Sequence, residues 1–457
     1  MTFSLLPITI IPAQMFHDND DWIKISDSLI NYWDIDTNRP ITISVGGNQL
    51  AARIERAAIS KDEILFEKRI FQKLSVPIQE SQWIASFSRT DHVLTLGPVI
   101  GILTEYNESE KEPSFRSIHA FCKELHHLVS EIGGFLFVFQ INDMTNTMLN
   151  GYFYQDSHWQ KAAIPFPDVI YNRIHSRRLE ASQLFETFKN EIESKNIAIF
   201  NDRFLSKEIV HNLLYSEEYM RPYLPETWIL TEQSLQEMSD KYPAIFIKPI
   251  HGSQGRNIIK AVKETEFLHV KVSTGTSKDR SFQFNTHKQF YKWLLPYLKK
   301  RTYLIQEEIP LMTYKNRQLD FRILCHKNFQ NTWKVTSAVA RISADQQFVS
   351  NIARGGELMK PIHILSLLSN RETAVQQLKL MKELAIEAST LVSQLTDGLI
   401  GELGVDIGVD VDGKLWIIEV NSKPSKNFEE ESNKIRPSAR ALLEYCTFLS
   451  FSTRRHD

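Results

Sequence analysis

The chain has 457 residues, which is too long for one ordinary hydrophobic core and predicts two to four domains. Its 53 lysines and arginines nearly balance its 55 aspartates and glutamates, which leaves a formal net charge of −2 without a long run of like charge. A protein that binds nucleic acid or an anionic membrane usually carries a basic surface. We therefore expect no nucleic-acid partner, no membrane partner, and a small-molecule ligand.

The N-terminal residues MTFSLLPITIIPAQMF contain an apolar run that Pro7 and Pro12 interrupt, without a basic start or a small-residue cleavage site. This pattern favours a first β-strand over a signal peptide. No run in the chain approaches the ~20 apolar residues of a membrane-spanning helix. Cys122, Cys325 and Cys446 lie far apart without CxxC spacing, which is typical of reduced thiols in a cytoplasmic protein.

Residues 1–96 contain short alternating or apolar segments separated by turn signals such as Gly46-Gly47-Asn48. Several short strands at this spacing predict a small β-rich N-terminal domain. The segments expected to be strands are residues 8–11, 40–45, 50–54 and 92–96.

Residues 97–200 show a different pattern, in which strands alternate with helices. This alternation predicts an α/β domain with a parallel sheet. The expected strands are residues 98–103, 135–139, 169–171 and 197–200, and the expected helices are residues 115–132 and 178–194.

The segment PDVIYNRIHSRR places Asn172, Arg173, Arg177 and Arg178 where one of these strands ends. Ligands of open α/β sheets bind outside the carboxyl ends of strands. The arginines therefore either hold a carboxylate or form the solvated start of a helix, and the sequence leaves both readings open.

Two later segments carry cationic and glycine-rich features suited to phosphates. NDRFLSKEIVHNLL predicts a helix with Lys207 near its start, and IFIKPIHGSQGRNIIK predicts a strand that ends at Lys248. Glycines allow backbone N–H groups to approach a phosphate, and the lysine supplies charge. The spacing matches neither a Walker A motif nor GxGxxG, and a plain hairpin turn also explains the glycines. The loop residues concerned are Gly252, Ser253, Gln254 and Gly255.

Residues 303–309, YLIQEEI, predict a strand, and LMTYKNRQLDFRILCHK predicts a second one that carries Asp320 and Arg322 on one face. Because side chains alternate along a strand, an ion pair between these two residues is the structural alternative to a role in binding. The strand WKVTSAVARIS adds Arg341, and the loop SNIARGGE adds Asn351.

The stretch GELGVDIGVDVDGKLWIIEVNSKP, residues 401–424, predicts a β-hairpin around Asp412-Gly413. Asp406 and Glu419 fall on opposite arms, and Asn421 shares a face with Glu419. Two carboxylates and an amide are hard oxygen ligands of the kind that Mg²⁺ prefers. An ordinary hairpin with solvent-facing acids is the alternative, although an unpaired carboxylate among the apolar neighbours of Glu419 would be costly.

The pattern Asp-x12-Glu-x-Asn followed by Pro424 is similar to the metal-binding end of the ATP-grasp superfamily. More narrowly, the chain resembles the YheC/YheD-type ATP-grasp proteins associated with the endospore coat, with motifs between Tyr171 and Pro424. The resemblance implies an α/β and α+β multidomain protein. Its expected parts are a β-rich domain at 1–96, an α/β pre-ATP-grasp domain at 97–200 and an ATP-grasp nucleotide-binding domain at 201–457.

The resemblance also implies a role for each candidate residue. The Mg²⁺ ligands would be Asp406, Glu419 and Asn421. The stabilisers of phosphate or acyl phosphate would be Arg322 and Arg341. The residues around ATP would be Lys207 and Lys248 with Gly252, Ser253, Gln254 and Gly255 at the phosphates, Gln306, Glu307, Glu308 and Ile309 at the adenine, Asp320 at the ribose, and Asn351 near the transferred phosphate.

The expected function is an ATP- and Mg²⁺-dependent ligase that joins a carboxylate to an amine through an acyl phosphate, on small-molecule or peptide substrates. By resemblance, it would act in spore formation and associate with spore coat proteins. The alternatives are a coat-associated assembly protein that binds ATP with little turnover, and phosphoryl transfer to a hydroxyl. Gly404 stands where some ligases have a substrate-binding arginine, and Ser425 replaces a glycine. The sequence therefore does not specify the substrates.

Overall fold

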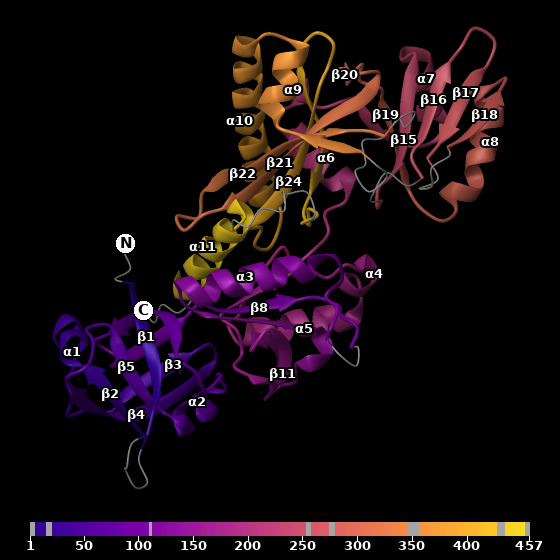
Figure 1. Ribbon diagram of the computed structural model, residues 1–457. Helices are drawn as coiled ribbons and strands as arrows, with labels where there is room; N and C mark the ends of the chain where they lie inside the picture. The colour runs from indigo at the N-terminus through magenta and orange to yellow at the C-terminus, as the bar shows by residue number, and fades with distance from the viewer. Residues whose placement is uncertain are drawn as a thin grey trace.

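The computed structural model describes residues 5–14, 21–108, 112–252, 257–273, 279–344, 356–426 and 435–452. A barrel lies beside an open sheet, and two further sheets form the other half of the molecule (Figure 1). The N-terminal run is a strand, as its sequence predicted. The three cysteines are buried and free, and none of the helices in these residues is long and apolar enough to span a bilayer.

The first unit is a closed barrel with the strand order β1-β5-β2-β4-β3-β7-β6. Alternating apolar residues fill its interior, as expected for strands with one buried face. Its strands are β1 (Leu6–Ala13), β2 (Trp22–Ser26), β3 (Ile41–Val45), β4 (Asn48–Ala57), β5 (Glu63–Glu67), β6 (Ser81–Ser88) and β7 (Val93–Gly97), and its helices are α1 (Asp27–Trp33) and α2 (Lys68–Leu74).

The second unit is a sheet with the order β11-β10-β9-β8-β12-β13. Its strands are β8 (Val99–Leu103), β9 (Phe135–Phe139), β10 (Leu149–Gln155), β11 (His158–Ile164), β12 (Val169–Asn172) and β13 (Ala198–Phe200). Its helices are α3 (His119–Ile132), α4 (Arg177–Glu180) and α5 (Gln183–Ser194).

The prediction of a parallel sheet holds for β8, β9, β12 and β13 and is wrong at one edge, where β10 and β11 form an antiparallel hairpin. Asp156 and Ser157 both have positive φ at its turn, the conformation that favours tight hairpins. The single helix expected at 178–194 is two helices, because the Ser182 hydroxyl accepts the Phe185 N–H and starts α5 anew.

The third unit is a smaller antiparallel sheet with the order β14-β19-β15-β16-β17-β18. Its apolar face packs under two helices around Phe290 and Ile305. The elements are β14 (Thr227–Ile229), α7 (Glu232–Lys241), β15 (Ala244–Pro249), β16 (Ile259–Lys263), β17 (Leu268–Val272), β18 (Arg280–Phe284), α8 (His287–Leu298) and β19 (Tyr303–Glu307).

The fourth unit is an antiparallel sheet with the order β23-β22-β21-β24-β25, to which β20 adds by pairing with β21. Apolar residues of α6, α9 and α10 cover one face. The elements are α6 (Lys207–Ser216), β20 (Thr313–Tyr314), β21 (Arg317–Lys327), β22 (Trp333–Ile342), β23 (Glu357–Met359), α9 (Pro361–Leu368), α10 (Arg371–Leu395), β24 (Glu402–Val409) and β25 (Leu415–Asn421).

The last helix, α11 (Pro437–Ser452), returns to the middle of the molecule and lies beside α3 (Figure 1). Its buried residues, including Tyr445 and Leu449, share one apolar cluster with α3 and with one face of the second sheet. The opposite face of that sheet packs in the same cluster as the barrel. The second sheet is therefore covered on both faces, as parallel strands require.

Candidate functional site

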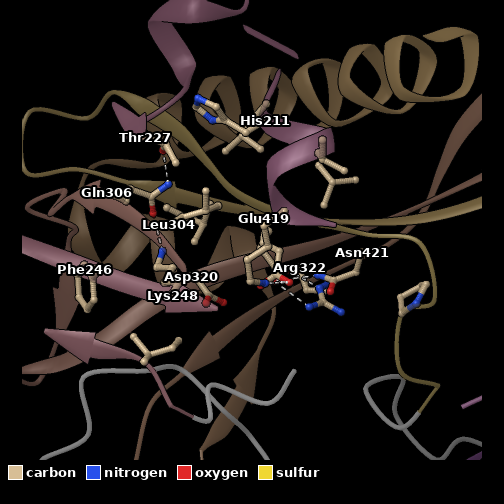
Figure 2. A pocket seen from close by; sticks show the side chains of 18 of the residues that line it. His211, Thr227, Phe246, Lys248, Leu304, Gln306, Asp320, Arg322, Glu419 and Asn421 are labelled. Carbon is tan, nitrogen blue, oxygen red and sulfur yellow. Dashed lines mark hydrogen bonds and ion pairs between the residues drawn. The ribbon is translucent and has the colours of Figure 1, made fainter. Parts of the chain in front are cut away.

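A cavity of about 610 Å³ lies between the two antiparallel sheets, helix α6 and the end of β12. Figure 2 shows side chains from both sheets and from α6 pointing into it. Most of the residues predicted from sequence line this one cavity. They are Lys207, Lys248, Gln306, Glu307, Glu308, Ile309, Asp320, Arg322, Arg341, Asp406, Glu419 and Asn421.

The remaining candidates belong to the two predicted phosphate loops. Gly252 lies just beyond β15, outside the cavity lining, and a side chain there would meet the Pro249 ring at 2.9 Å. Ser253, Gln254, Gly255 and Asn351 lie outside the described residues.

Helix α6 presents Lys207 to the cavity from its first turn. The Ser206 hydroxyl accepts the Ile209 N–H and fixes the start of the helix. The Lys207 ammonium forms an ion pair with Glu419 from β25. The pair therefore links the helix to the hairpin of the larger sheet.

A row of hydrogen bonds runs along the wall formed by the smaller sheet (Figure 2). The Lys248 ammonium donates to Gln306 Oε1 at 2.5 Å, and Gln306 Nε2 donates to Thr227 Oγ1 at 2.8 Å. Burial and the nearby Lys207 charge lower the pKa of Lys248 to about 8, although Glu419 acts in the opposite direction. The lysine therefore titrates close to neutral pH.

The hinge is the segment 306–309 at the end of β19. Two of its backbone N–H groups donate hydrogen bonds to other parts of the fold. The Glu307 N–H donates to Glu226 O at 3.1 Å, and the Glu308 N–H donates to Ala244 O at 3.0 Å. Within the described chain, the Ile309 N–H has no hydrogen-bond partner. Ile309 is therefore the hinge residue with a backbone donor available to a ligand.

Asp406 lies at the centre of a buried charge cluster on neighbouring strands. Its Oδ2 accepts Arg322 Nη2 at 2.8 Å and Arg341 Nη2 at 3.0 Å. Arg341 Nε also donates to Asp320 Oδ1 at 2.6 Å. The predicted alternative, an ion pair between Asp320 and Arg322, is not the pairing seen, because each acid faces the arginine of the adjacent strand.

Burial alone would raise the pKa of Asp406, but Arg322 and Arg341 outweigh it and hold the pKa below its ordinary value. For Arg341, burial opposes the charged form, while Asp320 and Asp406 overcome it and raise its pKa. Asp406 and Arg341 are therefore both charged at neutral pH.

The donor set for a divalent cation comes together on the predicted hairpin. Asp406 pairs directly with Glu419 across β24 and β25, and Asn421 Nδ2 lies 3.5 Å from Asp406 Oδ2. No group of three or more His, Cys, Asp or Glu suited to a metal occurs among the described residues. Two carboxylates and an amide are hard oxygen donors that fit Mg²⁺ and leave coordination positions for phosphate oxygens.

Glu402 is a buried residue that the sequence reading missed. Its carboxylate accepts the Tyr171 hydroxyl at 2.5 Å and His326 Nε2 at 2.9 Å, and it pairs with Lys426 and with Arg173 at 3.3 Å. Burial acts to raise the pKa of Glu402, but the surrounding donors hold it well below its ordinary value. Because these partners are distant in sequence, no local motif predicts the cluster around Glu402.

The end of β12 also contributes to the cavity. Arg173 and His175 line it, and so does Lys423, which follows the hairpin. Arg173 is only 5% exposed, so the reading of this segment as a solvated helix start is wrong for it. His175 and Lys423 were not predicted from the sequence. Each lies two positions after a predicted residue, His175 after Arg173 and Lys423 after Asn421.

A family model described as YheC/D-like ATP-grasp matches residues 196–449. Endospore coat-associated protein YheD of Bacillus subtilis (strain 168) is 28% identical over 395 residues, which cover 85% of this chain and 86% of that protein. Endospore coat-associated protein YheC of the same organism is 22% identical over 295 residues, which cover 64% of this chain and 78% of that protein.

Solved structures with a detectable likeness include ATP-grasp ligases. VanG D-Ala:D-Ser ligase from Enterococcus faecalis is 10% identical, with a TM-score of 0.47, over 77% of this chain and 98% of that one. The ATP-grasp ligase PsnB, complexed with a minimal precursor, Mg and ADP, is 14% identical, with a TM-score of 0.43, over 78% of this chain and 97% of that one.

Proposed function

Because the chain belongs to the YheC/D-like ATP-grasp family, we propose that it is an ATP- and Mg²⁺-dependent ligase that joins a carboxylate to an amine through an acyl phosphate. One observation carries the proposal. A single cavity contains the lysines Lys207 and Lys248, the acids Asp406 and Glu419, and a hinge with a backbone donor. Cations and metal-binding oxygens together suit a polyphosphate ligand.

In this proposal the nucleotide lies between the smaller sheet and α6. The Ile309 N–H donates to the adenine, while Phe246 and Leu304 supply apolar walls. Asp320 accepts from the ribose hydroxyls. Lys207 and Lys248 hold the phosphates together with the loop 252–255.

Asp406, Glu419 and Asn421 would hold Mg²⁺, which when bound supplies charge neutralisation between phosphate oxygens. The same acids now pair with Arg322, Arg341 and Lys207. These cations therefore lie beside the place where the phosphates are expected and can turn from the acids to phosphate oxygens.

In the first step, a carboxylate oxygen of the substrate forms a bond to the γ-phosphorus, and the bond to the β–γ bridging oxygen breaks, which releases ADP. In the second step, the amine attacks the acyl carbon, phosphate leaves, and the amine loses a proton. Arg322 and Arg341 stabilise the charge that develops on the transferred group through position alone. No nucleophile from the protein is required.

The acid and amine are proposed to be small molecules or peptides, and the reaction to belong to spore formation in the cytoplasm, in association with coat proteins. The names of the two Bacillus subtilis relatives support the spore association and also favour the alternative, an assembly protein that binds ATP with little turnover. We also propose residues 1–96, 97–200 and 201–457 as the domains.

The test measures ADP and phosphate release from purified protein given Mg²⁺-ATP and a small-metabolite extract of sporulating cells. The comparison protein is Glu419→Gln, with Glu383→Gln on the exposed face of α10 as the matched control. Release that Glu419→Gln abolishes and Glu383→Gln retains supports the ligase. A phosphorylated product in place of an amide identifies hydroxyl phosphorylation. Nucleotide binding without release in any extract favours the assembly protein.

A further inference from the structure

The second sheet has a topological switch point next to the cavity. Strand β8 lies between β9 and β12, so the chain moves to one side of β8 and later returns to the other. All three strands are parallel, and open sheets of this kind bind ligands beyond the carboxyl ends of the strands at such a point. The chain leaves β12 as Arg173-Ile174-His175, which line the cavity.

The ionisable residues that line this end of the cavity are an arginine, a histidine whose pKa is lowered by burial, and a lysine. They are Arg173, His175 and Lys423, and Ser117 and Ser425 add hydroxyl groups. We call these five residues the cationic subsite. The acids that line the cavity are Glu307, Glu308, Asp320, Asp406 and Glu419, which belong to the hinge and the larger sheet.

The acids that balance the cationic subsite lie behind its surface. Glu402 pairs with Arg173, Glu180 pairs with Lys423, and the Glu105 carboxylate accepts the His175 backbone N–H at 2.7 Å. None of these three acids lines the cavity. Glu402 and Glu180 hold the side chains of Arg173 and Lys423 in place, and Glu105 holds the backbone of His175.

Two buried nitrogen atoms of the cationic subsite have no hydrogen-bond partner within the described chain. Arg173 Nη2 donates to Pro424 O at 3.0 Å, but Arg173 Nε has no partner. His175 Nε2 also has none. Unpaired buried polar atoms are uncommon in folded proteins. These two lie on residues that line the cavity, where a ligand can pair with them.

The cationic subsite also adjoins the proposed site of phosphoryl transfer. A side chain at Gly404 would approach Pro424 Cβ at 2.8 Å and Arg322 Cδ at 3.3 Å, so Pro424 packs closely beside Arg322. Arg173 holds the carbonyl of the same proline. A single substrate can therefore reach from the cationic subsite toward Arg322.

We propose that the cationic subsite binds a carboxylate group that remains unreacted, so that the substrate is a dicarboxylic acid, an amino acid or a peptide with a free carboxylate. This inference rests on the proposed ligase function for its chemistry, and it names the substrate class. The carboxylate accepts hydrogen bonds from basic side chains, which are stronger than bonds between neutral groups.

Calorimetric titration tests the cationic subsite without turnover. The probes are glutarate and its neutral counterpart glutaramide. The variants are His175→Gln and the double variant Lys423→Met/Glu180→Gln, which avoids leaving the buried Glu180 unpaired. Each is expected to weaken glutarate binding about 10-fold, as the loss of one hydrogen bond to a charged group predicts. The control is His158→Gln, at the exposed β10–β11 turn. The unfolding midpoint of every variant is recorded.

Glutarate binding that exceeds glutaramide binding, weakens in both folded variants and is unchanged in the control supports the cationic subsite. Equal affinity for the two probes, no binding of glutarate, or unchanged glutarate affinity in both variants overturns it. ADP release is measured separately. If glutarate binding depends on His175 and Lys423 but no ADP is released, the ligase function is contradicted and the cationic subsite is supported. If ADP is released but glutarate binding does not depend on these residues, the ligase function is supported and the cationic subsite is contradicted.

Discussion

Arg322 and Asp406 face each other across β21 and β24, with 2.8 Å between guanidinium Nη2 and carboxylate Oδ2. Both side chains are buried, and Arg341 reaches the same carboxylate oxygen from β22. The cluster therefore joins three neighbouring strands through one acid.

Arg322→Met is expected to lower the free energy of unfolding by about 3 kcal/mol, the low end for breaking a buried ion pair, since Arg341 still faces Asp406. The double variant Arg322→Met/Asp406→Asn should lower the free energy of unfolding by less than the sum of the two single variants, because it removes both charges of the pair. Urea denaturation measures both. The control Lys379→Met, which breaks an exposed pair with Glu383, should change stability by less than about 0.5 kcal/mol. A strictly additive result would contradict this coupling.

Nucleotide affinity is expected to weaken as the pH rises through about 8, because Lys248 loses its proton there. Lys248→Arg keeps a charged group and should flatten this dependence. Titration of ADP at several pH values measures the effect. Identical pH profiles for wild type and Lys248→Arg would remove Lys248 from the phosphate site.

The lowered pKa of Lys248 should also affect the stability of the protein without any ligand. Between pH 8 and its ordinary pKa of 10.5, the unfolded chain holds a proton on Lys248 that the folded chain lacks. The ionisation of Lys248 should therefore make the free energy of unfolding rise with pH in this range. Lys248→Met should lose this part of the slope. An unchanged slope would show that the pKa of Lys248 is not lowered in the fold.

Glu402→Gln is expected to destabilise the protein by about 3 kcal/mol or more, because Arg173 and Lys426 lose their shared buried counter-charge. The native pKa of Glu402 lies below its ordinary value of 4.5, so the unfolded state binds the proton first as the pH falls. The stability advantage of wild type over Glu402→Gln should therefore shrink below pH 4.5. Denaturation at neutral and acidic pH measures it. A constant difference across this range would contradict the linkage.

Gly404→Ala is expected to cost about 1–3 kcal/mol through overpacking, because its methyl group would lie 2.8 Å from Pro424 Cβ. Thermal denaturation measures the loss. A variant as stable as wild type would show that the segment around Pro424 can move away.

Local patterns predicted the central hairpin well. Alternating apolar residues and Asp412-Gly413 located β24, β25 and their turn, and Gly413 adopts positive φ. The sequence placed Asp406 and Glu419 on opposite arms of the hairpin, and the strand register pairs them directly. The match of the chain to the YheC/D-like family confirms the ATP-grasp resemblance drawn from these residues.

Features made by distant segments could not be predicted in this way. Glu402 meets Tyr171 across 231 positions, and Arg322 meets Asp406 across 84, so neither pairing has a local signal. The closed barrel likewise depends on pairing between β1 and β6, which are remote in sequence. Strand alternation placed Asp320 and Arg322 on one face of their strand but did not identify their partners.

The position of α11 affects when the core of the second sheet can be completed during synthesis of the chain. The core that β8, β12 and α3 share with Tyr445 and Leu449 contains residues from the very last helix. On the ribosome, the second sheet emerges roughly in the first half of the chain, yet one of its faces waits for α11 before it is fully covered. Completion of that core therefore follows synthesis of both antiparallel sheets.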